Sequence, residues 1–372
     1  MIRLESQIDA AVDEHLAESA VDARLEIVSR LGGTVLGRLV PTAGTVAFDA
    51  SQRRGALDVD AIVGESIMHD RHPVGNLGQT LEVWWTWPMI GVSVPLGWWL
   101  VSEAEHVSGG LWRVSADPEG PARLDRAKWW EPGGIVVSGV AGAQITRMTR
   151  EAGVEWVPTL DFSEWKLPAT ECEAGATVLS TLEQIITQAG SELRPSRRGR
   201  GVEIGRRATG VESDWSWGNA GVPLVSVTGT PAVEEIPNRV TVWREDDKDG
   251  KRTVTGWSEM LKSGPRRWDG PYGRVPEVIR LDGPATQGAM RAQARRQLTR
   301  RIEEASTIQV TLRADPRIEV GDIATIRDTT SRTDCVGRVA SMKLDVGTGQ
   351  AEVECTVLRG TVCGQPAQVT TI

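Results

Sequence analysis

The chain has 372 residues, 40% of them hydrophobic and 25% charged, and its formal net charge is −8. This composition is typical of a folded protein rather than a disordered chain. The length suggests two or three domains. No run of 18 apolar residues and no secretory signal is present, so we expect no stable membrane insertion. The acidic balance argues against a protein that wraps nucleic acid by neutralising its phosphates.

The first predicted element is a helix within residues 2–22. Its apolar residues recur every four positions, as on one face of an amphipathic helix, and acidic residues surround them. The apolar positions are Ile8, Val12, Leu16 and Ala20, and the acidic ones are Asp9, Asp13, Glu14 and Glu18. We predict an N-terminal helical arm, residues 1–22, with an acidic outer face. It either docks on its own domain or reaches a neighbouring subunit.

From residue 23 to residue 108 the hydrophobic pattern has a period of two, which is typical of strands. Glycine and proline turns separate the strands and favour a β-barrel or sandwich. The apolar positions of the two clearest strands are Leu57, Val59, Ala61 and Val63, and then Leu81, Val83, Trp85 and Trp87. Residues 109–133, with Asp117-Pro118-Glu119-Gly120-Pro121, are predicted to be a loop.

Residues 134–225 are predicted to form an α+β domain. A strand over 134–139 precedes two helices, over 143–152 and 176–189, and Gly153 and Gly190 are suited to end these helices. The stronger second helix carries its apolar face on Leu179, Leu182, Ile185, Ile186 and Ala189.

Residues 226–360 return to strand patterns around one long helix, 285–305. Met290, Ala294, Leu298 and Ile302 form the apolar stripe of this helix. The acidic and basic run 245–251 predicts one hairpin tip and Gly347-Thr348-Gly349 predicts another. Residues 361–372 are predicted to be a loose tail. The predicted fold class is therefore β-rich α+β.

A glycine pattern occurs in both halves of the chain. Gly78 precedes a strand and Gly97 opens a later one; Gly321 and Gly337 do the same near the C-terminus. All-β domains often reuse such turns, and the alternative is a duplicated barrel within one chain. Related strand orders would support duplication, and unrelated ones would reject it.

The sequence offers few candidates for a metal or a cofactor. The cysteines Cys172, Cys335, Cys355 and Cys363 form no C-x-x-C pair. His69 and His72 are three residues apart, but no third ligand is evident, so we favour a solvated loop over a metal site. We name no catalytic, cofactor-binding or metal-binding residue.

Two basic groups are open to two interpretations. They are Arg197, Arg198, Arg200, Arg206 and Arg207, and the helical Arg291, Arg295, Arg296, Arg300 and Arg301. We favour a solvated loop for the first group and an exposed charged face for the second. The alternative for each is contact with an acidic partner or, for the first, nucleic acid.

Nucleophilic catalysis finds no support, since the G-x-S-x-G elbow of hydrolases does not occur. The glycines among the first group of arginines do not form a phosphate-binding loop, because G-x-x-x-x-G-K-[ST] is absent. The adjacent pairs Trp84-Trp85, Trp98-Trp99 and Trp129-Trp130 suggest either sugar stacking or protein contacts. Because neighbouring strand residues face opposite sides, we expect one tryptophan of each pair in the core and the other exposed or at an interface.

Several stretches resemble minor tail proteins of actinobacterial phages. The first domain of those proteins is similar to residues 23–59 and to Val94-Pro95-Leu96-Gly97-Trp98-Trp99-Leu100-Val101. Their C-terminal part is similar to Tyr272-Gly273-Arg274-Val275-Pro276, to 292–298 and to 314–322. That family is similar to the tail hub proteins of other phages and to the hub of type VI secretion spikes.

The resemblance implies a structural hub of the phage tail tip, assembled in the host cytoplasm. Each subunit would supply two tube-like β-barrels, 23–108 and 226–360, so that a homotrimer forms a pseudo-sixfold ring joining a sixfold tube to a threefold tip. The implied partners are the distal tail or tail tube protein, the tape measure protein, and tail fibre or tip proteins. DNA would pass through the lumen without specific binding.

Two other functions remain open at this stage. One is a carbohydrate-binding or cell-wall-degrading tail-tip enzyme, which needs a cleft with two carboxylates beside exposed tryptophans. The other is a spike hub of a secretion apparatus. For the ring itself we expect lumen-facing residues to be mostly Asp, Glu, Ser and Thr, since a negative lining repels DNA; a lining of Arg would contradict this.

Overall fold

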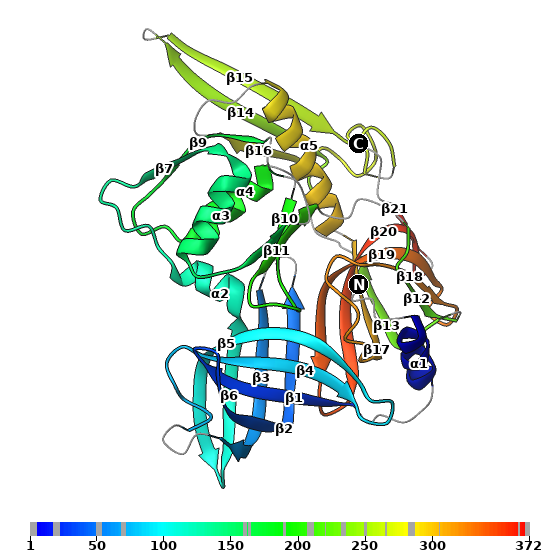
Figure 1. Ribbon diagram of the computed structural model, residues 1–372. Helices are drawn as coiled ribbons and strands as arrows, with labels where there is room; N and C mark the ends of the chain where they lie inside the picture. The colour runs from blue at the N-terminus through cyan, green and yellow to red at the C-terminus, as the bar shows by residue number, and fades with distance from the viewer. Residues whose placement is uncertain are drawn as a thin grey trace. The chain divides into compact units, whose positions relative to one another are not determined.

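Figure 1 shows a computed structural model of the protein. It describes residues 6–17, 23–49, 54–67, 72–158, 162, 165–188, 191–206, 212–219, 221–231, 236–248, 251–264, 266–281, 287–304, 306–363 and 365–368. Contacts divide the chain into two units. Unit 1 takes residues from 1–210, 311–322 and 340–353, and unit 2 from 211–310, 323–339 and 354–372. The fold is β-rich α+β with an N-terminal helix, α1 (Ser6–Ala17), as predicted.

The first six strands of unit 1 pair in a closed cycle. They are β1 (Arg24–Leu31), β2 (Thr34–Asp49), β3 (Arg54–Ser66), β4 (Gln79–Trp87), β5 (Val92–Ser108) and β6 (Leu111–Pro118). Their order is β1-β4-β5-β6-β3-β2, and β1 also pairs with β2. All six pairings are antiparallel. We call this group the first strand set.

Alternation positions the core of the first strand set. Its buried side chains include Leu57, Val59 and Ala61 on β3 and Leu81, Val83, Trp85 and Trp87 on β4, which confirms the predicted faces. Val63, predicted with the first group, is only half-buried. Because large apolar side chains fill the inside of the set, its outward faces are the surfaces open to partners.

The predicted loop 109–133 is wrong over much of its length. Residues 111–118 form β6, between β3 and β5, and α2 (Glu119–Arg126) follows directly. Pro118 is the N-cap of α2, and Gly120 and Pro121 lie in its first turn, where the backbone N–H groups need no partner within the helix. Turn-forming residues therefore mark a strand-to-helix junction here.

The rest of unit 1 has an α+β core, as predicted for this part of the chain. Its elements are β7 (Ile135–Val140), α3 (Ala141–Glu151), β8 (Trp156–Pro158), β9 (Lys166–Cys172), α4 (Val178–Gln188), β10 (Ser191–Pro195) and β11 (Val202–Arg206). Leu179, Leu182, Ile185 and Ile186 of α4 are buried in this core. The predicted Ala189 and Gly190 lie outside the described residues.

Unit 2 contains a three-stranded sheet covered on one face by a helix. The strands are β14 (Arg239–Lys248), β15 (Lys251–Met260) and β16 (Pro276–Arg280), in the order β15-β14-β16. The helix is α5 (Gln287–Glu304), and its predicted stripe, Met290, Ala294, Leu298 and Ile302, packs with Val240 and Val242. The paired ends of β14 and β15 confirm the predicted hairpin.

A second strand set repeats the order of the first. It contains β12 (Trp215–Gly218), β13 (Leu224–Pro231), β17 (Ser306–Arg313), β18 (Ile323–Asp328), β19 (Thr333–Asp345) and β20 (Gln350–Val362). The order is β12-β18-β19-β20-β17-β13. With the strands of each set ranked along the chain, both orders read first, fourth, fifth, sixth, third, second. Related strand order is the outcome that supports duplication.

The two sets differ at their first strand. β1 is antiparallel to β4, whereas β12 is parallel to β18. The glycine pattern also differs in detail. Gly78, Gly97 and Gly321 have positive φ, which favours glycine, but Gly337 does not.

The tail prediction for 361–372 is wrong for part of its length. β20 continues to Val362, and β21 (Gln365–Gln368) pairs with it. Residues 369–372 lie outside the described residues.

Candidate functional site

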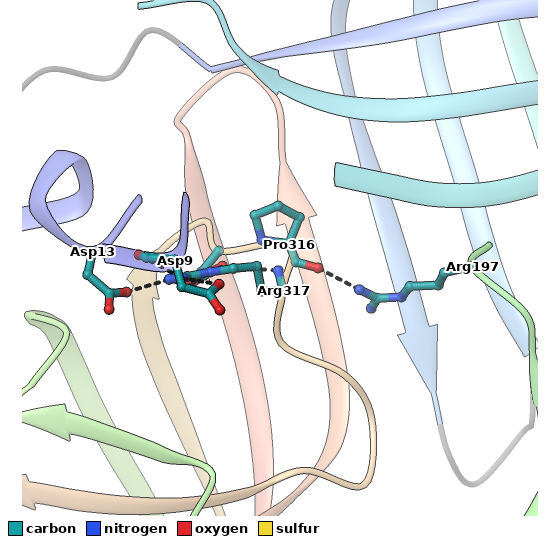
Figure 2. Close-up of polar contacts among 6 residues, drawn as sticks. Asp9, Asp13, Arg197, Pro316 and Arg317 are labelled. Carbon is teal, nitrogen blue, oxygen red and sulfur yellow. Dashed lines mark hydrogen bonds and ion pairs between the residues drawn. The ribbon is translucent and has the colours of Figure 1, made fainter. Parts of the chain in front are cut away.

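A dense set of charged contacts surrounds Arg317, in the segment between β17 and β18. Its guanidinium donates to both carboxylate oxygens of buried Asp315, and also to Asp9 at 3.1 Å and Asp13 at 2.6 Å on α1. Figure 2 shows α1 held to this segment through these contacts. One buried cation therefore binds three carboxylates within unit 1.

The helix α1 docks on its own chain, the first of its two predicted alternatives. Val12 and Leu16 are buried, and the ring of His15 contacts Trp87. Arg313 donates to the carbonyl oxygen of Leu16. The acidic outer face is corrected in part, because Asp9 and Asp13 bind Arg317; Ala20 and Glu18 lie outside the described residues.

The charge of Arg317 is strongly stabilised. Burial by itself lowers the pKa of Arg317, but the hydrogen bonds and negative charges of Asp315 and Asp13 outweigh burial. The pKa of Arg317 therefore lies above its ordinary value, and the residue stays charged. A buried charge of this kind is stable only while its partners remain.

Arg197 corrects the prediction of a solvated arginine loop. Only 6% of it is exposed, it donates to the carbonyl oxygen of Pro316 at 2.6 Å, and its guanidinium lies over the ring of Phe48. Figure 2 shows it reaching Pro316. Burial lowers the pKa of Arg197 against the opposing charges of Glu319 and Asp322.

Arg200 is also an internal contact. It forms two hydrogen bonds, of 2.8 and 3.0 Å, to buried Glu119 at the start of α2, and its guanidinium lies over Trp98. The hydrogen bond to Glu119 raises the pKa of Arg200. Arg198 is exposed as predicted, whereas Arg207 lies outside the described residues. Through Arg197 and Arg200, the loop therefore contacts the first strand set, the start of α2 and the segment that contains Pro316, all within unit 1.

A cavity in unit 1 lies beside Arg197. Residues Phe48, Asp49, Glu192, Leu193, Arg194, Pro195, Arg197, Glu203, Glu319 and Val320 line it. Its carboxylates have partners: Arg194 donates to Glu192, and Ser196 donates to Glu203 at 3.0 Å. Burial raises the pKa of Glu319, but nearby positive charges, among them Arg197 and Arg194, together outweigh burial, so the net shift is downward. The lining includes no tryptophan.

A row of acidic and hydroxyl side chains crosses the outward face of five strands. Paired positions run Asp345, Thr45, Asp58, Ser115 and Glu103, on β19, β2, β3, β6 and β5. Their neighbours along the strands, such as Val46 and Leu57, are buried, so this row faces outward. We call it the acidic row. Ser115 donates to Asp58 at 2.6 Å.

Beyond the acidic row, the next row along the strands contains a basic residue among carboxylates, and the row after that is apolar. Arg113 lies between Asp60, at 3.1 Å, and Glu105, at 3.9 Å, so carboxylates surround the basic residue. One row further, Val40 pairs with Ile62 and Ile62 with Leu111. Val40 is 53% exposed and Ile62 45%. An apolar rim therefore borders the acidic rows.

The arginines of α5 divide into two kinds. Arg291 binds Glu259 at 3.1 Å, and Arg301 binds Glu277 through two hydrogen bonds. Arg295 and Arg296 are exposed, as predicted for a charged outer face. The side chain of Arg300 lies outside the description.

The solvated loop predicted for His69 and His72 stays a prediction. His69 is outside the described residues, and the ring of His72 lies 5.0 Å from that of Trp112. Among the described residues, no three His, Cys, Asp or Glu side chains are placed to hold a metal ion. No described helix is long and apolar enough to span a membrane.

The core residue predicted for each tryptophan pair is confirmed, whereas an exposed partner is confirmed only at Trp130. Trp85, Trp99 and Trp129 are buried. Trp84 and Trp98 are half-buried, and Trp130 is 81% exposed. Arg30 and Arg200 lie over Trp98, so arginines rather than open space cover it.

Sequence reasoning missed the charged cluster at Arg317. It placed residues 314–322 only among the stretches that resemble phage tail proteins. The available signal was an aspartate two residues before an arginine, directly after the buried strand that contains Leu312. Such a pair can be buried only if further carboxylates approach, and sequence alone does not show that approach.

No known protein family matches the sequence, and no curated protein matches it. Solved structures with a similar fold do exist. The 43 kDa tail protein of prophage MuSo2 from Shewanella oneidensis matches with a TM-score of 0.66 and 16% identity over 89% of this chain and 98% of that one. A tail protein from Neisseria meningitidis gives 0.63 and 14% over 92% and 99%. Prophage tail protein gp18 from Listeria monocytogenes gives 0.58 and 10% over 89% and 94%. The chain therefore shares the fold of phage tail proteins.

Proposed function

We propose that the protein is a structural hub of a phage tail tip. Three copies form a ring in which each contributes its first strand set, within 24–118, and its second strand set, within 215–362, as two tube-like barrels. Six similar barrels then surround one passage, and the ring joins a sixfold tail tube to a threefold tip. The protein has no catalytic role in this proposal.

The observation that carries the proposal is the repeated strand order. Two sets of six strands in one chain follow the same order, which is what imitation of a sixfold ring by three copies requires. The fold shared with three tail proteins, two of them from prophages, supports the same assignment. The closed pairing cycle of the first set supports a barrel there.

The acidic row would line the passage. It contains Asp58, Glu103 and Asp345 with Thr45 and Ser115, the residue types expected for a lumen that DNA crosses without adhering. The ring would contact the distal tail or tail tube protein on one side and fibre or tip proteins on the other, with the tape measure protein inside. Its location would be the tail tip of the virion.

The two other functions receive less support. A sugar-binding or wall-degrading site needs free carboxylates beside exposed tryptophans. The cavity in unit 1 instead has Arg194 and Arg197 beside its carboxylates, and no tryptophan lines it. A spike hub of a secretion apparatus would use the same ring, and the genes beside this one distinguish it from a phage hub.

Mass determination of the purified protein over a range of concentrations tests the ring. We expect three copies per particle, and a particle of two copies, or a monomer at every concentration, would contradict it. The lining is tested by changing Asp58, Glu103 and Asp345 together to Lys. The trimer should then bind DNA in low salt and release it in high salt. Changing exposed Asp269, Asp334 and Glu171 to Lys is the control with the same net charge.

A further inference from the structure

The sheet contains an internal joint between the two strand sets. Residues Ser341–Asp345 of β19 pair antiparallel with Thr45–Asp49 of β2, both within unit 1. The preceding half of β19, 333–338, pairs with β18. Because β20 is the other neighbour of β19, β18 and β2 share one edge of this strand. The fifth strand of the second set thus binds the second strand of the first set.

Strand β5, the fifth strand of the first set, has the same layout as β19, except that one stretch of its edge has no partner strand in the described residues. Residues 92–100 of β5 pair with β4, and residues 99–108 pair with β6 on the opposite edge. Within the described residues, nothing pairs with 102–108 along the edge that β4 uses further back. This is the edge that corresponds to 341–345 of β19.

Strand β13, the second strand of the second set, corresponds to β2 and has an edge without a partner in the described residues. β13 ends the strand order, with β17 as its one neighbour in the described part of the chain. Its sequence, Leu-Val-Ser-Val-Thr-Gly-Thr-Pro, carries no charge, and Val225 is 57% exposed. Long, uncharged edge strands are surfaces onto which another strand adds, and natural proteins usually protect them.

We propose that β13 of one copy pairs antiparallel with residues 102–108 of β5 in the next copy. This seam repeats, between copies, the joint that β2 and β19 make within one chain. The contact is head-to-tail, so it closes into a ring when the rotation between copies allows. The inference rests on the proposed ring and names the strands that hold it together.

The internal joint predicts the register of the seam. Asp345 lies eight residues after Gly337, and Glu105 lies eight residues after Gly97. The partner of Asp345 is Thr45, four residues before the end of β2. The residue four before the end of β13 is Val227. Glu105 of one copy should therefore lie opposite Val227 of the next, and Glu103, the last residue of the acidic row, should lie opposite Gly229.

Cross-linking between two different variants tests the contact in trans. Glu105→Cys and Val227→Cys are made separately in a Cys363→Ser background, which removes the exposed native thiol. Opposed strand residues lie about 5.5 Å apart or less, within disulfide reach. Mixing the two proteins should give an oxidised heterodimer, and mixing Glu105→Cys with Val254→Cys, on exposed β15, should not. The register would be overturned if the protein is oligomeric but the Val227→Cys mixture gives no cross-link, or gives no more than the Val254→Cys mixture.

Proline substitution at Ser226 and at Val227 tests the seam without cross-links. Neighbouring N–H groups of a strand point to opposite edges, so one proline blocks the free edge and the other breaks pairing with β17. The variant that keeps the melting temperature of the parent protein should lose its oligomer, at least tenfold in dissociation constant. An oligomer that persists in this variant overturns the seam alone. A parent protein that is monomeric at every concentration overturns the seam and the ring together.

Discussion

The two strand sets share one order but end differently. In the first set, β1 has eight residues and pairs on both sides, with β4 and with β2, so the pairing cycle closes. In the second set, β12 has four residues, runs parallel to β18 and leaves β13 with a free edge in the described part. Closure and an available edge are separate properties, because β2 of the closed first set still pairs with β19 through Thr45–Asp49.

The connections between the third and fourth strands also differ. In the second set this connection carries the Arg317 cluster, with Asp315 fully buried. In the first set, neutral groups hold this connection in place. Ser29 and Gln79 donate to the carbonyl oxygen of Pro73 at 2.7 and 2.5 Å. The same topological step is fixed once by charge and once by neutral hydrogen bonds.

The largest expected effect is that of Arg317→Ala. It leaves the carboxylate of Asp315 buried without its cation and releases Asp9 and Asp13 of α1, so we expect a loss of about 3–5 kcal/mol of unfolding free energy. Urea unfolding measures it. The exposed Arg295→Ala should change stability by less than about 0.5 kcal/mol. Similar losses from both variants would show that the cluster is dispensable.

Leucines at matching strands compare the two cores directly. Leu57 on β3 and Leu312 on β17, each in the third strand of its set, are fully buried. Leu57→Ala and Leu312→Ala should each lose about 2–5 kcal/mol in urea unfolding. A loss below about 1 kcal/mol at Leu312 alone would mean that the second set lacks a packed core of its own.

Gln79→Ala should have a smaller effect than Arg317→Ala. The variant removes one of two donors to the Pro73 oxygen, and Ser29 still donates, so we expect a loss of about 1–3 kcal/mol. The same unfolding assay measures it. If the loss equals that of Arg317→Ala, charge makes no special contribution to the second connection.

The smallest effect concerns acid. The backbone N–H and the hydroxyl of Thr348 donate to the carboxylate of Asp345 at 2.7 and 2.9 Å and lower its pKa below the ordinary value. A lowered pKa stabilises the folded turn above about pH 4, and this contribution is lost as pH falls through the folded value. The protection factor of the Gly349 amide, which corrects for the intrinsic pH dependence of exchange, should therefore fall in acid. In Asp345→Asn it should lack this extra pH dependence.

Periodicity predicted much of the fold because burial follows it wherever a strand or helix has one apolar face. Leu57, Val59 and Ala61, and the stripe of α5, are cases where spacing alone was sufficient. It failed at Pro118 and Gly120, because the same residues serve loops and helix starts. It also missed the last strand, β21. This strand has only four residues, too few for a periodic pattern, and it is fixed by its pairing with β20.

The charged contacts could not be read from the sequence for a different reason. Arg197 and Arg200 sit in a glycine-rich run that is typical of solvated loops, and Phe48, Pro316 and Glu119, which bury them, lie about 80 to 150 residues away along the chain. Desolvation of an arginine depends on these distant partners. The acidic row was accessible in part, because Asp58 and Asp60 alternate with buried residues, but its continuity across five strands needed the register.

The most direct test of the account is a threefold reconstruction of the assembled protein by electron microscopy. The account predicts that a rotation of about 60° around the ring axis places strands β2, β3, β4, β5 and β6 of the first set onto β13, β17, β18, β19 and β20 of the second. A ring in which no such rotation relates the two sets, or an assembly with no central passage, would contradict it.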